Sequence, residues 1–319
     1  MKRSTFIRAS LSTLVISAVM APAMANEYPD RPLELIVPFA VGGGTDAVAR
    51  AFSDGAQKYL PKGVVVVNRP GAAGAIGHSE GANAKPDGYK LTMVTPEINL
   101  ALLQGIGKAK AQDFIFIAKL NADPIVLFVP TDSPFKTLED VIAKAKAKPD
   151  ELALANSGKG ATYHLAAIAL EEKAGVKFNN IPYVGAGPEI LGVLANQVEG
   201  GFATTGEAGV YVKQGKFRLL GVMASERLKE FPDVPTFKER GLDVQLGTWR
   251  ALAAPKGTPA PVVAKLKEVV QKVTQEKKYQ DFFKNLYLGM VYEDGEKFGP
   301  ALEREHKFYS DIVTKLNLK

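Results

Sequence analysis

The sequence predicts an α/β fold built from two domains. Short apolar runs rich in β-forming residues alternate with stretches of helical period, which is typical of an α/β protein with mostly parallel sheets. A predicted leader leaves 294 of the 319 residues, enough for two domains of ordinary size. Two proline-marked segments, Asp123-Pro124 and 231–235, bracket a middle block and indicate where the chain crosses between the domains.

Eight strands and five helices follow from this pattern. The predicted strands cover residues 33–39, 64–67, 91–94, 114–120, 125–129, 152–155, 198–202 and 217–223. The predicted helices cover residues 46–58, 137–147, 162–174, 186–195 and 260–274. The last helix is the clearest, because Val262, Leu266, Val269 and Val273 recur at helical spacing with lysines between them.

The two crossings divide the chain that follows the leader. They define a discontinuous first domain, 26–124 plus 225–319, and a second domain, 125–224. Two crossings between domains form a hinge, and a cleft between hinged domains commonly binds a small ligand. We therefore expect the functional site to lie between the domains.

Residues 1–25 have the features of a secretory signal peptide. Lys2, Arg3 and Arg8 precede an apolar stretch, 11–20, and the segment ends in the small-residue pattern Ala23-Met24-Ala25. The apolar stretch is shorter than the roughly 20 residues that span a bilayer. We expect cleavage after Ala25 and a periplasmic location. The chain has no cysteine, so neither a disulfide nor a lipidated cysteine is expected.

Charge and composition argue against two classes of partner. The leader carries three basic residues and no acidic one, so its removal changes 40 Lys and Arg to 37 against 34 Asp and Glu, and the net charge from +6 to +3. The chain lacks basic blocks interleaved with aromatic residues. We therefore expect no binding to nucleic acid or to a membrane surface, and a monomer.

The segment from Leu35 to Arg50 is the most informative part of the chain. An apolar strand, 35–37, is followed by three consecutive glycines, 42–44, whose backbone N–H groups can face a ligand. Thr45 or Asp46 can then cap a helix that begins near residue 47. The N-terminus of a helix attracts an anion by about 0.3 to 1 kcal/mol, so this loop predicts an anion-binding site.

Two later segments repeat this order of strand, glycine-rich loop and helix start. They cover residues 152–162 and 181–188, and both lie in the predicted second domain. The first loop therefore faces the other two across the predicted cleft. Opposed sets of helix N-termini suit a ligand with more than one carboxylate.

Several side chains are candidates for specificity. Arg250 can form a bidentate contact with a carboxylate, and a structural ion pair is an equal alternative. Glu207 disfavours a polyanion unless it receives a hydroxyl, an amine or a proton. His164 either donates to an anion or satisfies the start of its helix. The other candidates are polar residues that follow predicted strands: Thr95, Asn99, Thr204 and Thr205.

Two enzyme motifs occur in the chain without their usual context. The glycine loop at 42–47 matches a dinucleotide fingerprint, but the second strand ends in Asn68-Arg69 where an acidic residue would bind the ribose. The segment 77–81 matches the nucleophile elbow around Ser79, yet it follows a glycine-rich run instead of a strand. The three histidines show no metal-binding spacing. We expect no metal, no cofactor and no catalytic residue, and a secreted serine hydrolase is the alternative from the enzyme class.

The motifs together resemble the Bug/TctC family of periplasmic solute-binding proteins, the receptors of tripartite tricarboxylate transporters. The resemblance covers the whole chain after the leader and includes PFAVGGGTDAVAR at 38–50, VVNRPGAAGAIG at 66–77, IPYVGAGPEI at 181–190 and DVPTFKERG at 233–241. It implies a two-lobed type II periplasmic-binding-protein fold, a Venus flytrap that closes on a carboxylate. It also implies delivery of that ligand to a large and a small membrane subunit.

The resemblance further implies which loops contact the ligand. It places the proximal carboxylate near Ala40 and the glycine loop, opposite Ser157, the 160–162 turn and the 185–187 turn. With the side chains above, we expect these ligand-binding residues: Ala40, Gly42, Gly43, Gly44, Thr45, Asp46, Thr95, Asn99, Ser157, Gly160, Ala161, Thr162, His164, Gly185, Ala186, Gly187, Thr204, Thr205, Glu207 and Arg250. The expected function is a receptor for a di- or tricarboxylate that serves transport, or, as a further alternative, a membrane sensor.

Overall fold

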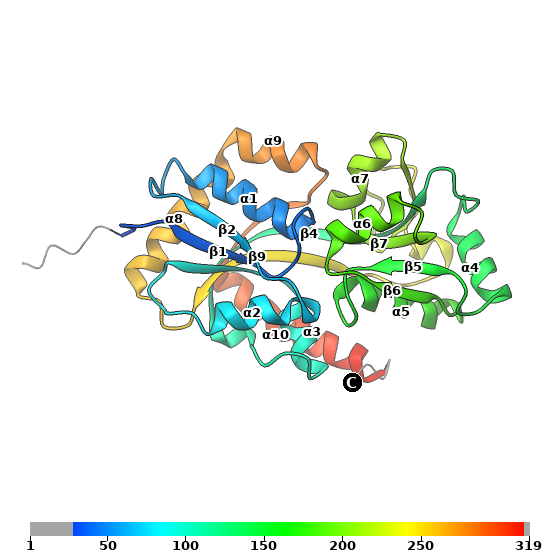
Figure 1. Cartoon of the computed structure of the whole chain (residues 1–319), viewed down its shortest axis with the longest axis horizontal. Coiled ribbons are helices and arrows are strands. Elements are labelled where there is room, and N and C mark those ends of the chain that lie inside the picture. The colour runs from blue at the N-terminus through cyan, green and yellow to red at the C-terminus, as the bar shows by residue number, and fades with distance from the viewer. Residues whose placement is uncertain (1–27, 316–319) are drawn as a thin grey trace, which may run out of the picture.

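A computed structural model describes residues 28–315, and the predicted signal peptide therefore lies outside the described residues. The described chain forms two α/β lobes that lie side by side along the long axis of the molecule (Figure 1). The α/β fold predicted from the sequence is confirmed. Within residues 28–315, no helix combines the length and apolar character needed to cross a membrane.

The sheet of the first lobe is mixed. It contains β1 (Leu33–Val37), β2 (Val64–Asn68), β3 (Lys90–Val94), β9 (Gly247–Pro255), β10 (Met290–Asp294) and the first part of β4 (Phe114–Pro130). Strand β1 is parallel to β2 and β3, whereas β9 is antiparallel to β3 and β4, and β10 is antiparallel to β4.

The sheet of the second lobe continues from the same long strand. The end of β4 pairs antiparallel with β7 (Gly200–Thr204) and β8 (Phe217–Val222), and β5 (Ala153–Asn156) is parallel to β7 and to β6 (Asn179–Pro182). The prediction of mostly parallel sheets is therefore wrong. Strand β4 runs through both lobes, so it joins the two predicted strands at 114–120 and 125–129 and introduces antiparallel neighbours in each sheet.

Helices cover both sheets. In the first lobe they are α1 (Gly44–Ala56), α2 (Ala75–Ala82), α3 (Glu97–Leu103), α8 (Ala260–Gln275), α9 (Lys277–Asn285) and α10 (Gly295–Lys315). In the second lobe they are α4 (Leu138–Ala147), α5 (Thr162–Ala174), α6 (Ala186–Leu194) and α7 (Thr205–Lys213). The prediction for α5 matches its observed limits, whereas α2, α3, α7, α9 and α10 were not among the predicted helices.

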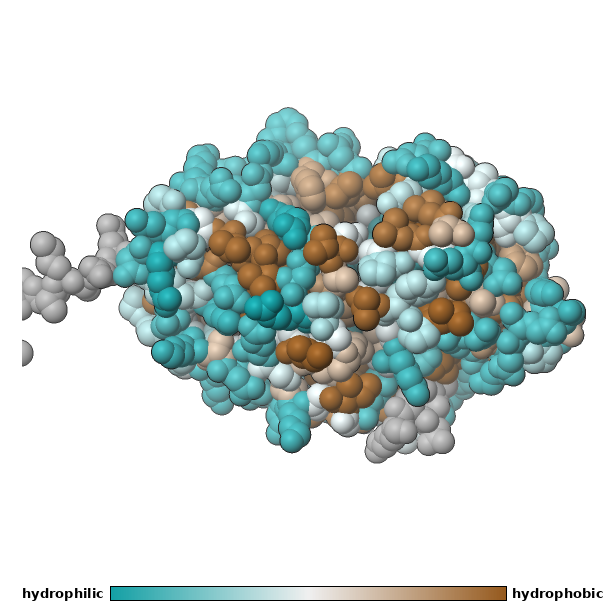
Figure 2. Space-filling view, viewed as in Figure 1, coloured by the Kyte–Doolittle hydropathy of each residue, from teal (hydrophilic) through white to brown (hydrophobic). Residues whose placement is uncertain are grey.

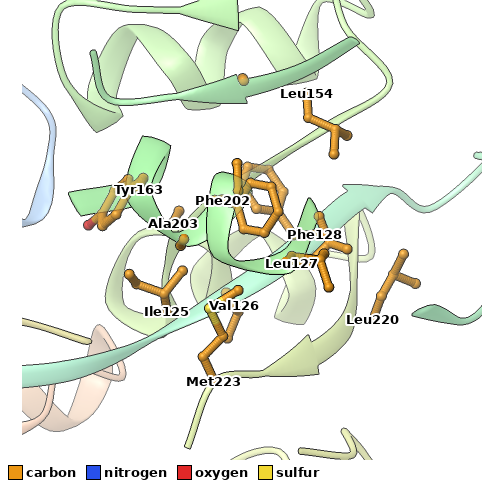
Figure 3. Packing of buried hydrophobic residues seen from close by; sticks show 14 of the residues in the cluster. Ile125, Val126, Leu127, Phe128, Leu154, Tyr163, Phe202, Ala203, Leu220 and Met223 are labelled. Atoms are coloured by element: carbon orange, nitrogen blue, oxygen red, sulfur yellow. The ribbon is translucent and has the colours of Figure 1, made fainter. Parts of the chain in front are cut away.

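Each lobe has its own hydrophobic core. In the first lobe, α1, α8 and α9 bury a cluster that includes Phe52 and Val270 against one face of the sheet. In the second lobe, the run 125–129 of β4 is fully buried and packs against Phe202 and Leu154 from neighbouring strands (Figure 3). A continuous apolar run of this kind is typical of a strand that is covered on both faces.

The chain crosses between the lobes at two neighbouring points. Pro124 of β4 and Gly247 of β9 are partners in the antiparallel ladder, so the outward and return crossings lie side by side. Phe237 and Leu246, which precede Gly247, belong to the core of the second lobe. We therefore propose that the second lobe extends to Leu246, beyond the limit at 224 that the sequence predicts, because the return segment packs there.

Helix α10 contacts both lobes through one face. Its Phe298 and Leu302 pack in the first lobe, and its Tyr309 joins the core of the second. Between them, Glu305 accepts a hydrogen bond from the indole Nε1 of Trp249 and is largely enclosed. Burial raises the pKa of Glu305 to about 7, and the hydrogen bond from Trp249 opposes this shift.

We expect Glu305 to make stability depend on pH in the acid range. Its pKa is about 7 in the folded protein and 4.5 by reference, so the folded state retains a proton that the unfolded state has lost. Its stabilising contribution is complete below pH 4.5 and is lost as the pH rises to about 7.

The variant Glu305→Gln should remove this pH dependence of the free energy of unfolding. As the pH rises from 4.5 to about 7, the difference in the free energy of unfolding between wild type and Glu305→Gln should change by up to about 3 kcal/mol, because one pKa unit corresponds to about 1.4 kcal/mol. Urea unfolding at pH 4.5, 6 and 7.5 measures it, and Glu268→Gln on the surface of α8 is the control. Parallel profiles for wild type and Glu305→Gln would contradict the prediction.

Candidate functional site

Loops from both lobes meet at one small cavity. The loops that follow β1, β3, β5, β6 and β7 contribute to it, together with β9. The free volume inside is about 20 Å³, which is room for about one water molecule. The lining residues are Phe39, Gly43, Gly44, Thr45, Thr95, Glu97, Ser157, Tyr163, Ala186, Glu207, Thr248 and Arg250.

The glycine loop is held in shape by Asp46. The side chain of Asp46 accepts hydrogen bonds from the backbone N–H of Gly42, from Asn68 and from Arg50. Burial alone would raise the pKa of Asp46, but the hydrogen bonds from Arg50, Gly42 and Asn68 outweigh it and lower the pKa. Asp46 therefore binds its own loop, and Asn68 has a structural role in place of a nucleotide contact.

Helix α1 is capped from the other lobe. It begins at Gly44, earlier than predicted, and neither Thr45 nor Asp46 serves as its N-cap. The backbone N–H of Gly44 donates to Oε1 of Glu207 at 2.8 Å. The predicted anion-binding N-terminus thus holds a carboxylate, and that carboxylate belongs to α7 of the second lobe.

Glu207 receives donors on both of its oxygens. It lies in the first turn of α7, where the backbone N–H and the hydroxyl of Thr204 donate to Oε2 in a capping box. Tyr163 donates to the same oxygen at 2.6 Å, and Arg250 lies 3.2 Å from Oε1. Helix α7 was not predicted, but the sequence does contain a signal for it, because Thr204-x-x-Glu207 matches a capping box.

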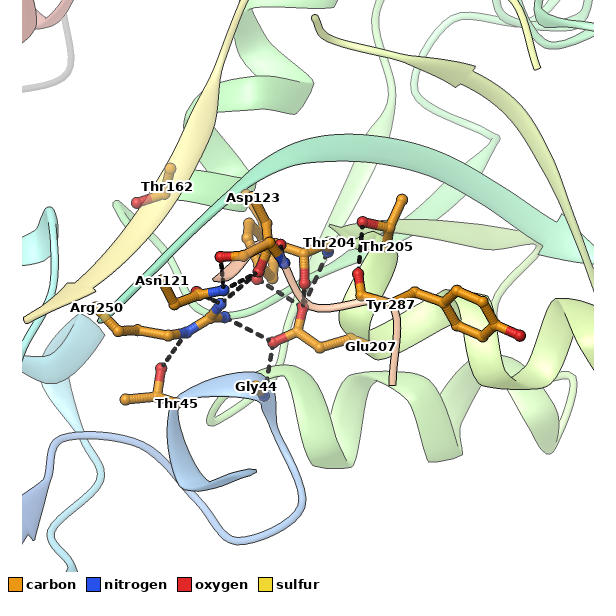
Figure 4. A network of polar contacts seen from close by, with 12 residues as sticks. Gly44, Thr45, Asn121, Asp123, Thr162, Thr204, Thr205, Glu207, Arg250 and Tyr287 are labelled. Atoms are coloured by element: carbon orange, nitrogen blue, oxygen red, sulfur yellow. Dashed lines mark hydrogen bonds and ion pairs between the residues drawn. The ribbon is translucent and has the colours of Figure 1, made fainter. Parts of the chain in front are cut away.

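Arg250 lies at the centre of a buried polar network (Figure 4). It stands opposite Asn121 in the β4–β9 ladder and is 1% exposed. Its guanidinium contacts Asp123 at 2.9 Å, Glu207 at 3.2 Å and the hydroxyl of Thr45 at 3.2 Å, and it also donates to Asn121. Of the two roles that the sequence left open, the structure shows the ion pairs.

The start of helix α5 mirrors that of α1. Its N-cap residue, Ala161, provides no side-chain cap, and the backbone N–H and hydroxyl of Thr162 both donate to Oε1 of Glu97. Glu97 begins α3 in the first lobe and is 3% exposed. A carboxylate from each lobe therefore binds a helix start in the other lobe.

His164 satisfies the turn before α5. Its Nδ1 accepts a hydrogen bond from the backbone N–H of Gly160 at 3.1 Å. Burial lowers the pKa of His164, which favours the neutral ring that this acceptor role requires. The structure therefore shows His164 in contact with its own helix start.

The start of helix α6 closes against the glycine loop. A Cβ on Gly187 would lie 2.4 Å from the carbonyl oxygen of Val41, and the backbone N–H of Ala40 faces the carbonyl oxygen of Val184 at 3.4 Å. Val41 and Val184 flank this contact and are exposed. Figure 2 shows the lobes in contact across this face, with apolar side chains near the line where they meet.

Eight of the twenty predicted site residues line the cavity, and whether they contact a ligand stays a prediction. The lining residues among them are Gly43, Gly44, Thr45, Thr95, Ser157, Ala186, Glu207 and Arg250. Nine others form the surrounding loops: Ala40, Gly42, Asp46, Gly160, Ala161, Thr162, His164, Gly185 and Gly187.

Three predicted residues face other groups. Asn99 contacts Glu305 and His306 of α10, a helix that the sequence had not predicted. The hydroxyl of Thr205 donates to the carbonyl oxygen of Tyr287, and Thr204 caps α7. Conversely, Phe39, Glu97, Tyr163 and Thr248 line the cavity without having been predicted. Glu97 follows β3 by three residues, so its position after a strand was the available signal.

The geometry of a nucleophile elbow is missing at Ser79. This residue lies inside α2, not on a turn between a strand and a helix. The neighbouring His78 is buried, burial lowers its pKa to about 3, and its Nε2 faces Thr95. Among residues 28–315, no group of three or more His, Asp or Glu side chains could hold a metal ion.

The two lobes and the cavity lined by helix starts define a class, the two-lobed binding proteins for small anions. A family model for the tripartite tricarboxylate transporter family receptor, TctC, matches residues 48–318. The chain belongs to this family, as its sequence motifs indicated.

Solved structures support the family and the fold. The periplasmic binding protein BugD is 31% identical, with 92% of this chain and 99% of that chain covered and a TM-score of 0.87. A malate-bound structure of MatC from Rhodopseudomonas palustris is 28% identical, with 90% and 100% covered and a TM-score of 0.84.

A third structure shares more sequence but superposes less well. A TctC solute-binding protein from Polaromonas, solved without ligand, is 42% identical over 90% of this chain and 99% of that chain, yet its TM-score is 0.66. A lower TM-score at higher identity is the expected result when the lobes of one fold are arranged differently.

We expect Arg250→Met to destabilise the protein strongly. The substitution leaves the buried carboxylates of Asp123 and Glu207 without their cation, which costs roughly 3 to 5 kcal/mol. Urea unfolding measures the loss. Arg227→Met is the matched control, because Arg227 pairs with Glu239 at the surface and such pairs contribute about 1 kcal/mol or less. Equal losses in the two variants would contradict the importance of the buried network.

Proposed function

We propose that the chain is a periplasmic receptor that closes on an organic carboxylate and delivers it to a tripartite tricarboxylate transporter. One observation carries the proposal: helix starts from both lobes meet at one cavity, and two of them already bind carboxylates. Gly44 and Thr162 each donate a backbone N–H to a glutamate from the opposite lobe. Groups that hold a side-chain carboxylate have the chemistry to hold a ligand carboxylate.

The proposal is limited to an organic carboxylate. The sequence predicts a di- or tricarboxylate, whose carboxylates would bind at helix starts that are open to the ligand. The starts of α1 and α5 are occupied by Glu207 and Glu97, so the number of ligand carboxylates is a separate question. The malate in MatC supports carboxylate binding in the family and does not fix the ligand of this chain.

In this proposal, a hinge motion of the lobes lets the ligand enter the cavity. A cavity for about one water molecule is too small for an organic acid, so the lobes must part to admit it. The adjacent crossings at Pro124 and Gly247 provide a natural axis. The lower TM-score with the ligand-free Polaromonas structure supports a mobile arrangement.

The protein acts by binding and not by catalysis in this proposal, after cleavage of the leader and export to the periplasm. The position of Ser79 within α2 weighs against the serine hydrolase. A large and a small membrane subunit receive the ligand. A receptor that serves a membrane sensor uses the same site, and a deletion strain that still takes up the ligand would favour that alternative.

A thermal-shift screen of mono-, di- and tricarboxylates tests the proposal. A ligand at one hundred times its Kd adds about 2.7 kcal/mol to the free energy of unfolding, which corresponds to a rise in Tm of several degrees. Ser79→Ala should show the same rise as wild type. A flat response to every acid in the panel at millimolar concentration would count against a carboxylate receptor.

We expect Gly187→Ala to weaken binding of the carboxylate found in that screen by at least tenfold. The new Cβ would meet the carbonyl oxygen of Val41 at 2.4 Å and keep the lobes apart, while each core stays intact. Isothermal titration measures the affinity, and unfolding measures the stability. Gly299→Ala is the control, because a Cβ at Gly299 meets no heavy atom within 4 Å. Unchanged affinity in Gly187→Ala would show that closure at this contact is not needed.

A further inference from the structure

The side chains that line the cavity include more carboxylates than cations. Its lining includes two carboxylates, Glu97 and Glu207, and one cation, Arg250. All three side chains are buried, with exposures of 3%, 8% and 1%. Arg250 is already paired with both Asp123 and Glu207, so its charge is balanced inside the protein. A second carboxylate on a ligand would add negative charge to a site that lacks a free cation among its lining residues.

Glu97 differs from Glu207 in having a free oxygen. Both oxygens of Glu207 receive donors, from Gly44, Thr204, Tyr163 and Arg250. Glu97 receives Thr162 on Oε1 alone, and its Oε2 is buried without a hydrogen-bond partner in the described structure. Within residues 28–315, Glu189 of α6 is also buried with both oxygens unpartnered, but only Glu97 of the two lines the cavity. Buried carboxylate oxygens normally have donors, so Oε2 of Glu97 marks a place for a donor that the ligand brings.

The start of α6 also lies at the cavity. Helix α6 begins after Gly185, and no side chain caps it. Ala186 in its first turn and Ser157 line the same cavity as Glu97. Once the lobes part, the start of α6 is therefore free to bind a ligand carboxylate, and Glu97 is free to accept from a cationic donor.

We infer that the ligand is a monocarboxylate that also carries an ammonium group, and that Glu97 receives this ammonium group. The inference rests on the proposed function and narrows its substrate class. An ammonium group gives Oε2 of Glu97 a charge-assisted hydrogen bond and balances the excess negative charge. A dicarboxylate of the same length places a second carboxylate at that point and is repelled. Glu97 is thus the residue that selects an amino acid over a dicarboxylate.

Matched pairs of ligands test this selection. Each pair has the same chain length and differs only in one end: 3-aminopropanoate with succinate, 4-aminobutanoate with glutarate, and 5-aminopentanoate with adipate. Glycine and alanine extend the series to α-amino acids. Isothermal titration should give at least tenfold tighter binding for an amino acid than for its dicarboxylate partner.

The variant Glu97→Gln should remove that preference. It keeps an oxygen to accept from Thr162 and replaces the charged Oε2 by an uncharged amide. The affinity for the preferred amino acid should fall at least tenfold, and dicarboxylate binding should be equal or stronger. Glu268→Gln is the matched control, because Glu268 lies on the exposed face of α8, and this variant should bind like wild type. If Glu97→Gln does not fold, the preference of the wild-type protein within each ligand pair still tests the inference.

Three outcomes overturn the inference, and they can be told apart. Tighter binding of a dicarboxylate by wild type, or full amino acid affinity in Glu97→Gln, refutes the role of Glu97 and leaves the carboxylate receptor intact. Absence of binding for every amino acid refutes the inference alone when the thermal-shift screen finds another carboxylate, and it refutes the receptor as well when that screen is flat for every acid.

Discussion

The arrangement of the lobes depends on the buried charges around Arg250. This side chain lies on β9 beside the crossing at Gly247, and it neutralises Asp123 of β4 and Glu207 of α7. Burial raises the pKa of Asp123, a sign of how costly an unpaired charge is there. Glu207 in turn holds the N–H of Gly44 on α1. One guanidinium therefore connects the hinge, the start of α1 and the opposite lobe.

The exchange of carboxylates between the lobes also explains why the helix starts lack local caps. Gly43 and Ala161 precede α1 and α5, and neither can cap through a side chain. A local Ser or Asp would satisfy the N–H within its own lobe, with no benefit from contact between the lobes. Because the caps come from Glu207 and Glu97, these two helix starts are satisfied only when the lobes meet. Closure and capping are thus one event.

Local patterns allowed much of the fold to be predicted, and long-range pairing set the limit. The helix 260–274 follows from its own apolar spacing, and the glycine loop from its composition. The partners of Arg250 lie 43, 127, 129 and 205 residues away in sequence, so only the topology brings them together. Glu97 had no signal in the sequence beyond its position shortly after the predicted strand 91–94. Its contact with Thr162, 65 residues away, gives it a different role.

The groups around the cavity act on a charged ligand in two opposite ways. Helix starts attract a negative group, whereas the carboxylates of Glu97 and Glu207 oppose any further one. A ligand carboxylate that displaced Oε1 of Glu207 from Gly44 would also disturb one of the ion pairs of Arg250. A carboxylate at α6 disturbs neither contact. The ligand that we infer, with one negative group at α6 and one donor at Glu97, therefore disturbs the network least, and under this inference charge pattern contributes more to specificity than the glycine loop.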